Sequence, residues 1–232
     1  MSNWEVLGTA AIPDSQKQLK FSRRGDEFSI RISGVQGELM NSRMHGSEEA
    51  LAELGCGTLQ SVDQPRVLVG GLGMGFTLAA TLKSVPASAQ VTVAELVPEV
   101  IEWNRGPLGE CAGKPLDDTR TRIHVGDVAE MLLQQRRFHA ILLDVDNGPE
   151  GITHADNHWL YSFDGLAAIY QSLVPEGMLA IWSAGPDQMF MIRLKKSGFR
   201  VSTQTVRARP GKGSRHTIFL AQRPLRPPRK RR

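Results

Sequence analysis

The chain has 232 residues, 41% hydrophobic and 22% charged, which is the composition of a globular protein and excludes a fibrous or disordered one. Its formal charge is +4, but residues 223–232 carry six positive charges and no negative one, so residues 1–222 have a net charge of −2. Only two cysteines are present, a secretory signal is lacking, and no apolar run is long enough to cross a bilayer, so we expect a cytoplasmic protein without a membrane partner.

The first sixty residues predict a β-rich extension with one helix. Two short alternating runs, Leu19–Arg23 and Glu27–Ile32, flank a Gly-Asp pair and therefore predict a hairpin. Further along, Ser47–Glu49 opens an apolar-periodic helix, which we expect Gly55 to end. The two acids of that segment lie at the positive end of the helix dipole, where they stabilise it.

Residues 61–222 predict one α/β domain, because strands alternate with helices along this part of the chain. Continuous apolar runs such as Arg66–Val69 are typical of buried parallel strands. The last two strands, Arg200–Val206 and His216–Ala221, lie too close together for a helical crossover and should pair antiparallel. We therefore predict a Rossmann-like, mostly parallel seven-stranded sheet with helices on both faces and an antiparallel last strand, followed by a disordered basic tail at residues 223–232.

A glycine-rich turn follows the first strand of this domain, where the sequence reads VLVGGLGMG. Gly71, Gly73 and Gly75 let the backbone turn tightly and approach a ligand without interference from a Cβ atom. Phe76 stands where the dinucleotide-binding pattern has its third glycine, which argues against a pyrophosphate ligand. The turn therefore predicts a site for a nucleoside ligand that lacks phosphates.

Acidic residues follow the next three strands of the domain. Glu95 lies 20 residues beyond Gly75, where a carboxylate can accept hydrogen bonds from both ribose hydroxyls. Asp127 is placed to accept from an adenine amino group, and Asp144 and Asp146 follow the fourth strand. Because the carboxyl ends of parallel strands meet at the binding crevice of an α/β sheet, we expect these side chains to lie together. The alternative is a structural turn with three unrelated, solvent-facing acids.

Four segments of the chain, GGLGMG, AELVPEVIEW, HVGDVAEML and ILLDVDNGP, resemble the class I S-adenosylmethionine-dependent methyltransferase fold and, within it, spermidine synthase and its relatives. The resemblance covers roughly residues 20–185. It implies that Glu95 and Asp127 bind the nucleoside and that Asp144 is the catalytic aspartate, which also contacts the cofactor. It further implies a small-molecule acceptor such as a cationic amine, and it leaves a homodimer open, because relatives often pair through their N-terminal strands.

Two departures from that family bear on the transferred group. The glycine turn of the family carries an aspartate that holds the ammonium group of decarboxylated S-adenosylmethionine, whereas Leu72, Gly73 and Met74 supply no carboxylate. The family's D-x-x-D-P loop corresponds to DVDNGP in this chain, so the second acid, Asp146, is displaced. The cofactor is therefore either S-adenosylmethionine or its decarboxylated form. The family favours aminopropyl transfer to an amine, the missing acid favours methyl transfer to a small molecule, and a non-catalytic nucleoside-binding or scaffold protein is the third alternative.

Both transfers are displacements at a sulfonium carbon, and an amine nucleophile needs a carboxylate that orients it and takes its proton. Asp144 is the predicted catalytic residue, with Asp146 beside it. No metal is predicted, because neither Asp146-Asn147 nor the pair His154 and His158 has an evident third ligand. A basic cluster near the C-terminal hairpin lacks the interleaved aromatic residues of an RNA-binding surface, so the sequence does not favour a nucleic-acid partner.

Overall fold

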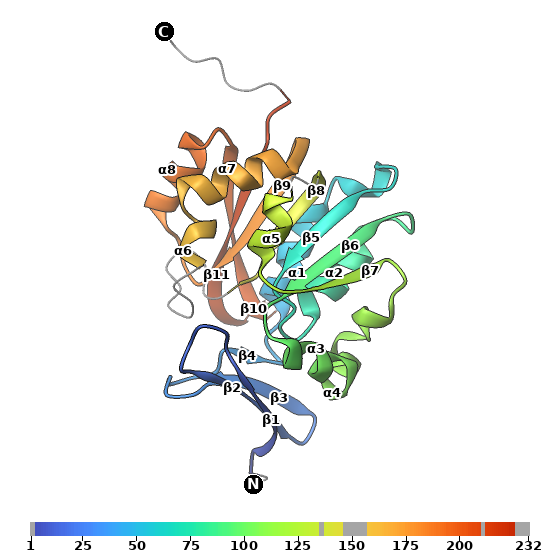
Figure 1. Cartoon of the computed structure of the whole chain (residues 1–232), viewed down its shortest axis with the longest axis vertical. Coiled ribbons are helices and arrows are strands. Elements are labelled where there is room, and N and C mark those ends of the chain that lie inside the picture. The colour runs from blue at the N-terminus through green and yellow to red at the C-terminus, as the bar shows by residue number, and fades with distance from the viewer. Residues whose placement is uncertain (1–2, 135–136, 146–156, 210–211, 226–232) are drawn as a thin grey trace.

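The computed structural model describes residues 3–134, 137–145, 157–209 and 212–225, which form two sheets and the helices around them (Figure 1). The strands are β1 (Glu5–Ala11), β2 (Gln18–Arg24), β3 (Glu27–Ile32), β4 (Met40–Asn41), β5 (Arg66–Gly70), β6 (Gln90–Glu95), β7 (Thr121–Val125), β8 (Phe138–Leu143), β9 (Leu173–Ser183), β10 (Arg200–Arg209) and β11 (Lys212–Gln222). The helices are α1 (Gly46–Cys56), α2 (Phe76–Ser84), α3 (Pro98–Arg105), α4 (Pro107–Ala112), α5 (Val128–Leu133), α6 (Asn157–Leu160), α7 (Phe163–Ser172) and α8 (Gln188–Lys196), with short 3-10 turns at Leu59–Ser61 and Pro115–Asp117.

The larger sheet has seven strands in the order β10-β11-β9-β8-β5-β6-β7. β5 lies inside it and pairs in parallel with β6 and β8, and β7 and β9 extend the parallel set on either side. β11 runs antiparallel to both of its neighbours, β9 and β10. The prediction of a Rossmann-like α/β fold with an antiparallel last strand is confirmed.

Successive side chains of the central strands point to opposite faces of this sheet and contribute to two hydrophobic cores, one on each face. Val67 and Val69 of β5 pack with the N-terminal sheet, α1, α2 and α3, whereas Leu68 between them packs with α5, α7 and α8. All three side chains are fully buried. Helices therefore cover both faces of the sheet, as the alternation of strands and helices predicts (Figure 1). Within the described part of the chain, no helix is long and apolar enough to cross a membrane.

Two local features differ from the sequence-based expectation. β1 was not predicted, because this edge strand buries only Ala10 and shows no apolar alternation. α1 does not end at Gly55 but continues to Cys56. Gly55 is buried against Leu142 and Ala180, and a Cβ atom at this position would overlap the Leu142 side chain. This glycine therefore allows the helix to lie close to the sheet, and does not cap the helix.

The division of the chain at residues 60 and 222 remains a prediction. α1 precedes the first of these boundaries, yet it packs against α2, β8 and β9 of the larger unit. After the second boundary, the Arg223 N–H donates to the carbonyl of Gly177 (2.9 Å), and the Arg223 guanidinium lies 4.8 Å from the centre of the Tyr170 ring. The rest of the predicted basic tail, beyond Leu225, lies outside the described residues.

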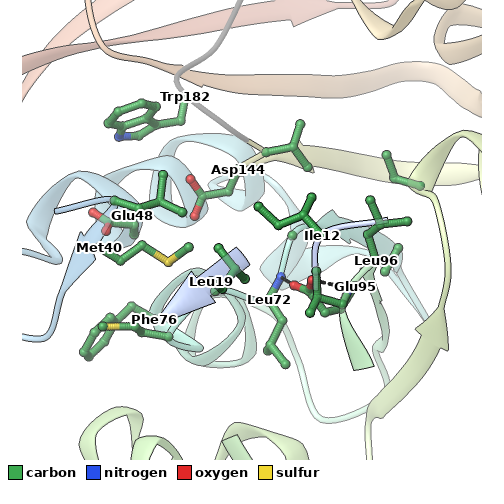
Figure 2. A pocket seen from close by; sticks show the side chains of 18 of the residues that line it. Ile12, Leu19, Met40, Glu48, Leu72, Phe76, Glu95, Leu96, Asp144 and Trp182 are labelled. Atoms are coloured by element: carbon green, nitrogen blue, oxygen red, sulfur yellow. Dashed lines mark hydrogen bonds between the residues drawn. The ribbon is translucent and has the colours of Figure 1, made fainter. Parts of the chain in front are cut away.

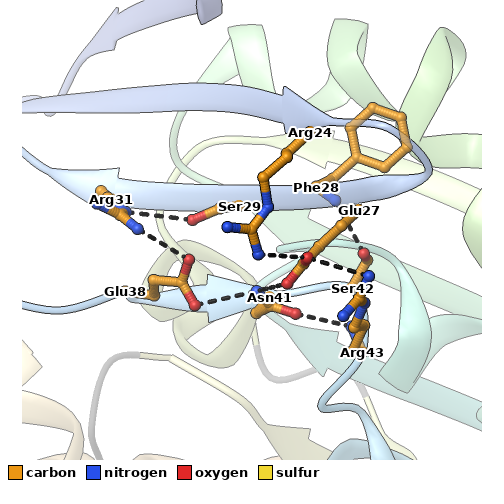
Figure 3. A network of polar contacts seen from close by, with 9 residues as sticks. All are labelled: Arg24, Glu27, Phe28, Ser29, Arg31, Glu38, Asn41, Ser42 and Arg43. Carbon is orange, nitrogen blue, oxygen red and sulfur yellow. Dashed lines mark hydrogen bonds and ion pairs between the residues drawn. The ribbon is translucent and has the colours of Figure 1, made fainter. Parts of the chain in front are cut away.

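A polar network ties β3 to β4 in the N-terminal sheet (Figure 3). The buried Glu27 carboxylate accepts a hydrogen bond from the Asn41 side chain (2.9 Å) and pairs with Arg24 and Arg43 at 2.9 and 3.2 Å. The hydrogen bonds from Asn41 and Arg24 hold the pKa of Glu27 below its ordinary value. The network thereby fixes β4, and both β4 residues, Met40 and Asn41, line the pocket described next.

Candidate functional site

A pocket of about 200 Å³ lies between the N-terminal sheet and the carboxyl ends of the parallel strands (Figure 2). The strand ends contribute the glycine turn and three of the predicted acids, Glu95, Asp127 and Asp144. The N-terminal segment contributes an apolar roof, which consists of Ile12, Leu19, Ile32, Leu39 and Met40. Gly71 and Gly73 line the pocket, whereas Gly75 lies behind it as the N-terminal cap of α2. Asp146 lies outside the described residues.

The glycine turn has a backbone that residues with side chains rarely adopt. The φ angles are +88° at Gly71, +52° at Gly73 and +84° at Gly75. A Cβ atom at Gly71 would overlap the carbonyl oxygen of Asp144, because the turn lies directly against the end of β8. Glycine at position 71 is therefore required both for the turn and for its close approach to the neighbouring strand.

Gly71→Ala is expected to lower the free energy of unfolding by about 1–3 kcal/mol more than Gly34→Ala does, because of overpacking. Gly34 is a matched control: its φ is +72°, but a Cβ atom there meets nothing within 4 Å. The conformational strain is common to both variants, so their difference reports the contact with Asp144 alone. Urea denaturation of the two variants measures it, and equal losses would contradict the close approach.

Glu95 holds the glycine turn in place. Its Oε2 accepts a hydrogen bond from the Leu72 N–H and its Oε1 accepts one from the Val97 N–H, each at 2.9 Å. Burial raises the pKa of the Glu95 carboxyl, although the surrounding backbone N–H groups act in the opposite direction. Several backbone N–H groups thus converge on this carboxylate and fix the turn, and the predicted contact with a ribose hydroxyl stays a prediction.

Asp127 likewise has a structural contact and a free acceptor. Its Oδ1 accepts from the Ala129 N–H at 2.8 Å and caps α5. The Asp127 side chain also lines the pocket, and among the described residues its Oδ2 has no hydrogen-bond donor. The predicted contact with an adenine amino group is compatible with this arrangement.

Asp144 shares one end of the pocket with a second acid, Glu48 of α1. Figure 2 shows these two residues and Trp182 at that end and Glu95 at the other. The Thr77 hydroxyl donates to Asp144 Oδ2 at 2.5 Å, yet burial raises the pKa of Asp144 to about 6. Burial, together with the negative charge of Asp144, raises the pKa of Glu48 to about 7.

The pocket is acidic. Its charged lining residues are Glu48, Glu95, Asp127 and Asp144, and no lysine, arginine or histidine of the described chain lines it. No three His, Cys, Asp or Glu side chains among the described residues lie close enough together to hold a metal ion. Four carboxylates with an aromatic ring at one end suit a ligand with a positive charge.

The sequence predicts no site role for Glu48 and Trp182, which line the pocket, or for Thr77, whose hydroxyl donates to Asp144. A signal for Glu48 existed, because it lies one turn before Leu51 and two turns before Gly55, on the buried face of α1. A carboxylate on the buried face of an amphipathic helix needs a functional or structural explanation. Nothing in the local sequence marks Thr77 or Trp182, since Thr77 contacts Asp144, and Trp182 lines the pocket, only through the packing of α2 and β9.

Comparison with known proteins supports the fold. No protein-family model matches the sequence, and no curated protein sequence matches it. Two solved structures of spermidine synthase, one from Thermotoga maritima and one in complex with the transition state analogue AdoDATO, match with a TM-score of 0.72. Each is 19% identical in sequence and aligns with 96% of this chain and 73% of its own. The predicted spermidine synthase-like fold is therefore confirmed, whereas the activity must be argued from the site.

Proposed function

We propose that this protein is a transferase that binds decarboxylated S-adenosylmethionine and transfers its aminopropyl group to a small amine. The acidic pocket carries the proposal. The decarboxylated donor has two positive charges, on its sulfonium and ammonium groups, and four carboxylates without a cationic side chain among the described lining residues favour such a ligand. S-adenosylmethionine itself carries an additional carboxylate, which this pocket would repel.

The remaining pocket residues suit the nucleoside part of the same donor. Gly71 and Gly73 line the pocket with backbone, and Glu95 and Asp127 line it beside them as acceptors for ribose hydroxyls and an adenine amino group. Beneath the apolar roof, the donor would be largely shielded from water. One of the two spermidine synthase structures of the same fold contains a transition state analogue, AdoDATO.

The chemistry is a displacement at carbon. The donor supplies the sulfonium leaving group; the amine nitrogen forms a bond to the adjacent carbon as the carbon–sulfur bond breaks, and sulfur keeps the electron pair as 5′-methylthioadenosine. Asp144 accepts the proton that the amine loses. Without ligand the pKa of Asp144 is about 6, so its carboxylate is ionised at neutral pH and available to accept a proton. Thr77 holds the carboxylate in position.

Methyl transfer from S-adenosylmethionine is the second candidate. It is favoured by the glycine turn, where Leu72 and Met74 are 3% and 4% exposed and supply no carboxylate for an ammonium group. Both candidates bind the nucleoside in the same pocket. Their donors differ only in whether the ligand carries a carboxylate.

Isothermal titration with three ligands separates these candidates. We expect 5′-methylthioadenosine to bind, because it contains the adenosine part, and decarboxylated S-adenosylmethionine to bind at least about tenfold tighter than S-adenosylmethionine, which corresponds to about 1.4 kcal/mol. Tighter binding of S-adenosylmethionine would overturn aminopropyl transfer and favour methyl transfer. Absence of binding by all three would overturn the nucleoside site.

A further inference from the structure

Glu48 is placed in the pocket by the packing of α1 on the larger sheet. The helix buries Leu51, Ala52 and Gly55, and Glu48 extends the same face into the pocket. Its carboxylate Oε2 accepts a hydrogen bond from the Ser47 hydroxyl at 2.6 Å. Figure 2 shows Glu48 on the same side of the pocket as Asp144 and Trp182, away from Glu95.

The carboxylates of Glu48 and Asp144 have no counter-ion within the described chain. None of the ion pairs between described residues includes either of them, whereas the adjacent Glu49 lies 3.1 Å from His45. Leaving two half-buried acids at one end of a pocket without a cation is unfavourable, and the raised pKa values of both groups are consistent with this. A cation from outside the chain would relieve it, and the ring of Trp182 adds a favourable surface for such a group.

We propose that Glu48, together with Asp144, binds the primary ammonium group of the donor, and that Glu48 is the residue that selects the decarboxylated donor. This inference rests on the proposed function. We assign the group to the donor; the attacking nitrogen of the acceptor cannot be the cation, because it must be neutral to form a bond with carbon. In S-adenosylmethionine the carbon that bears the ammonium also bears a carboxylate, which would lie beside Glu48 and Asp144 and be repelled by both.

The test is the affinity of Glu48→Gln for two nucleosides that differ by the aminopropyl group. Loss of a charge-assisted hydrogen bond is expected to weaken the binding of decarboxylated S-adenosylmethionine by about 10- to 100-fold. Binding of 5′-methylthioadenosine, which has neither the ammonium nor the sulfonium charge, should change by less than about twofold. Retained binding of 5′-methylthioadenosine also shows that the Glu48→Gln variant is folded. Glu53→Gln is the matched control, because Glu53 lies on the exposed side of the same helix.

The outcomes distinguish this inference from the proposed function. A selective loss of affinity for the decarboxylated donor, absent in Glu53→Gln, supports the role of Glu48. If Glu48→Gln keeps full affinity for the donor, or loses affinity for both nucleosides equally, Glu48 does not bind the ammonium, and the proposed function stands without it. If the unaltered protein binds neither nucleoside, the proposed function itself is overturned, and this inference with it.

Discussion

Replacing Asp144 by asparagine is expected to slow the release of 5′-methylthioadenosine by about 100- to 10,000-fold at saturating donor, because the variant cannot take the proton of the attacking amine. The geometry should survive the change, since an asparagine oxygen can still accept the hydrogen bond that the Thr77 hydroxyl gives to Asp144. The rate is measured with decarboxylated S-adenosylmethionine and 1,4-diaminobutane or a longer diamine as the acceptor.

Two comparisons make this result specific. Asp117→Asn is the matched control, because Asp117 is exposed and does not line the pocket, and its rate should equal that of the unaltered protein. Binding of 5′-methylthioadenosine to Asp144→Asn should remain within about threefold, since that nucleoside has no group for Asp144 to bind. A rate for Asp144→Asn that matches the control would remove Asp144 from the mechanism.

The protein without ligand is expected to become less stable as the pH rises through about 6 and 7. The folded-state pKa values of Asp144 (about 6) and Glu48 (about 7) lie above their ordinary values of 3.8 and 4.5. Between these limits the folded state binds more protons than the unfolded state, so the free energy of unfolding falls with rising pH. The stability due to the two groups is fully present below pH 3.8 and lost by about pH 8, with a combined effect of about 2–5 kcal/mol.

Glu48→Gln isolates this effect from other titrating groups. His139 and His216 have pKa values lowered by burial and act in the opposite sense near pH 6.5. In urea denaturation, the variant should match the unaltered protein below about pH 4 and exceed it by about 1–3 kcal/mol at pH 8. The same change that weakens donor binding should thus stabilise the empty protein. A difference between the two proteins that does not vary with pH would show that Glu48 is not a buried, uncompensated acid.

The surroundings of Glu48 could be predicted only in part from the sequence. The sequence predicts that the two acids at the start of α1 interact favourably with the helix dipole, and both Glu48 and Glu49 lie in its first turn. Glu48 differs from Glu49 only in the face of the helix that it occupies. The sequence places Asp146 beside Asp144, and Asp146 lies outside the described residues; within them, the negative charge of Asp144 helps to raise the pKa of Glu48. No local pattern indicates that Glu48 and Asp144 share the pocket, because proximity in the fold does not follow from proximity in the chain.

The sequence by itself determined the α/β architecture, the glycine turn and the acids at the strand ends. These features depend on periodicity and on spacing along the chain, and parallel strands carry their carboxyl ends to one edge of the sheet wherever they occur. Only the tertiary structure decided which charges face one another. Glu48 and Asp144 are 96 residues apart, on a helix and a strand end, and they meet because Gly55 lets α1 lie directly against the sheet. The apolar roof was decided in the same way, because the polar network around Glu27 fixes β4 over the pocket, and no local pattern encodes that contact.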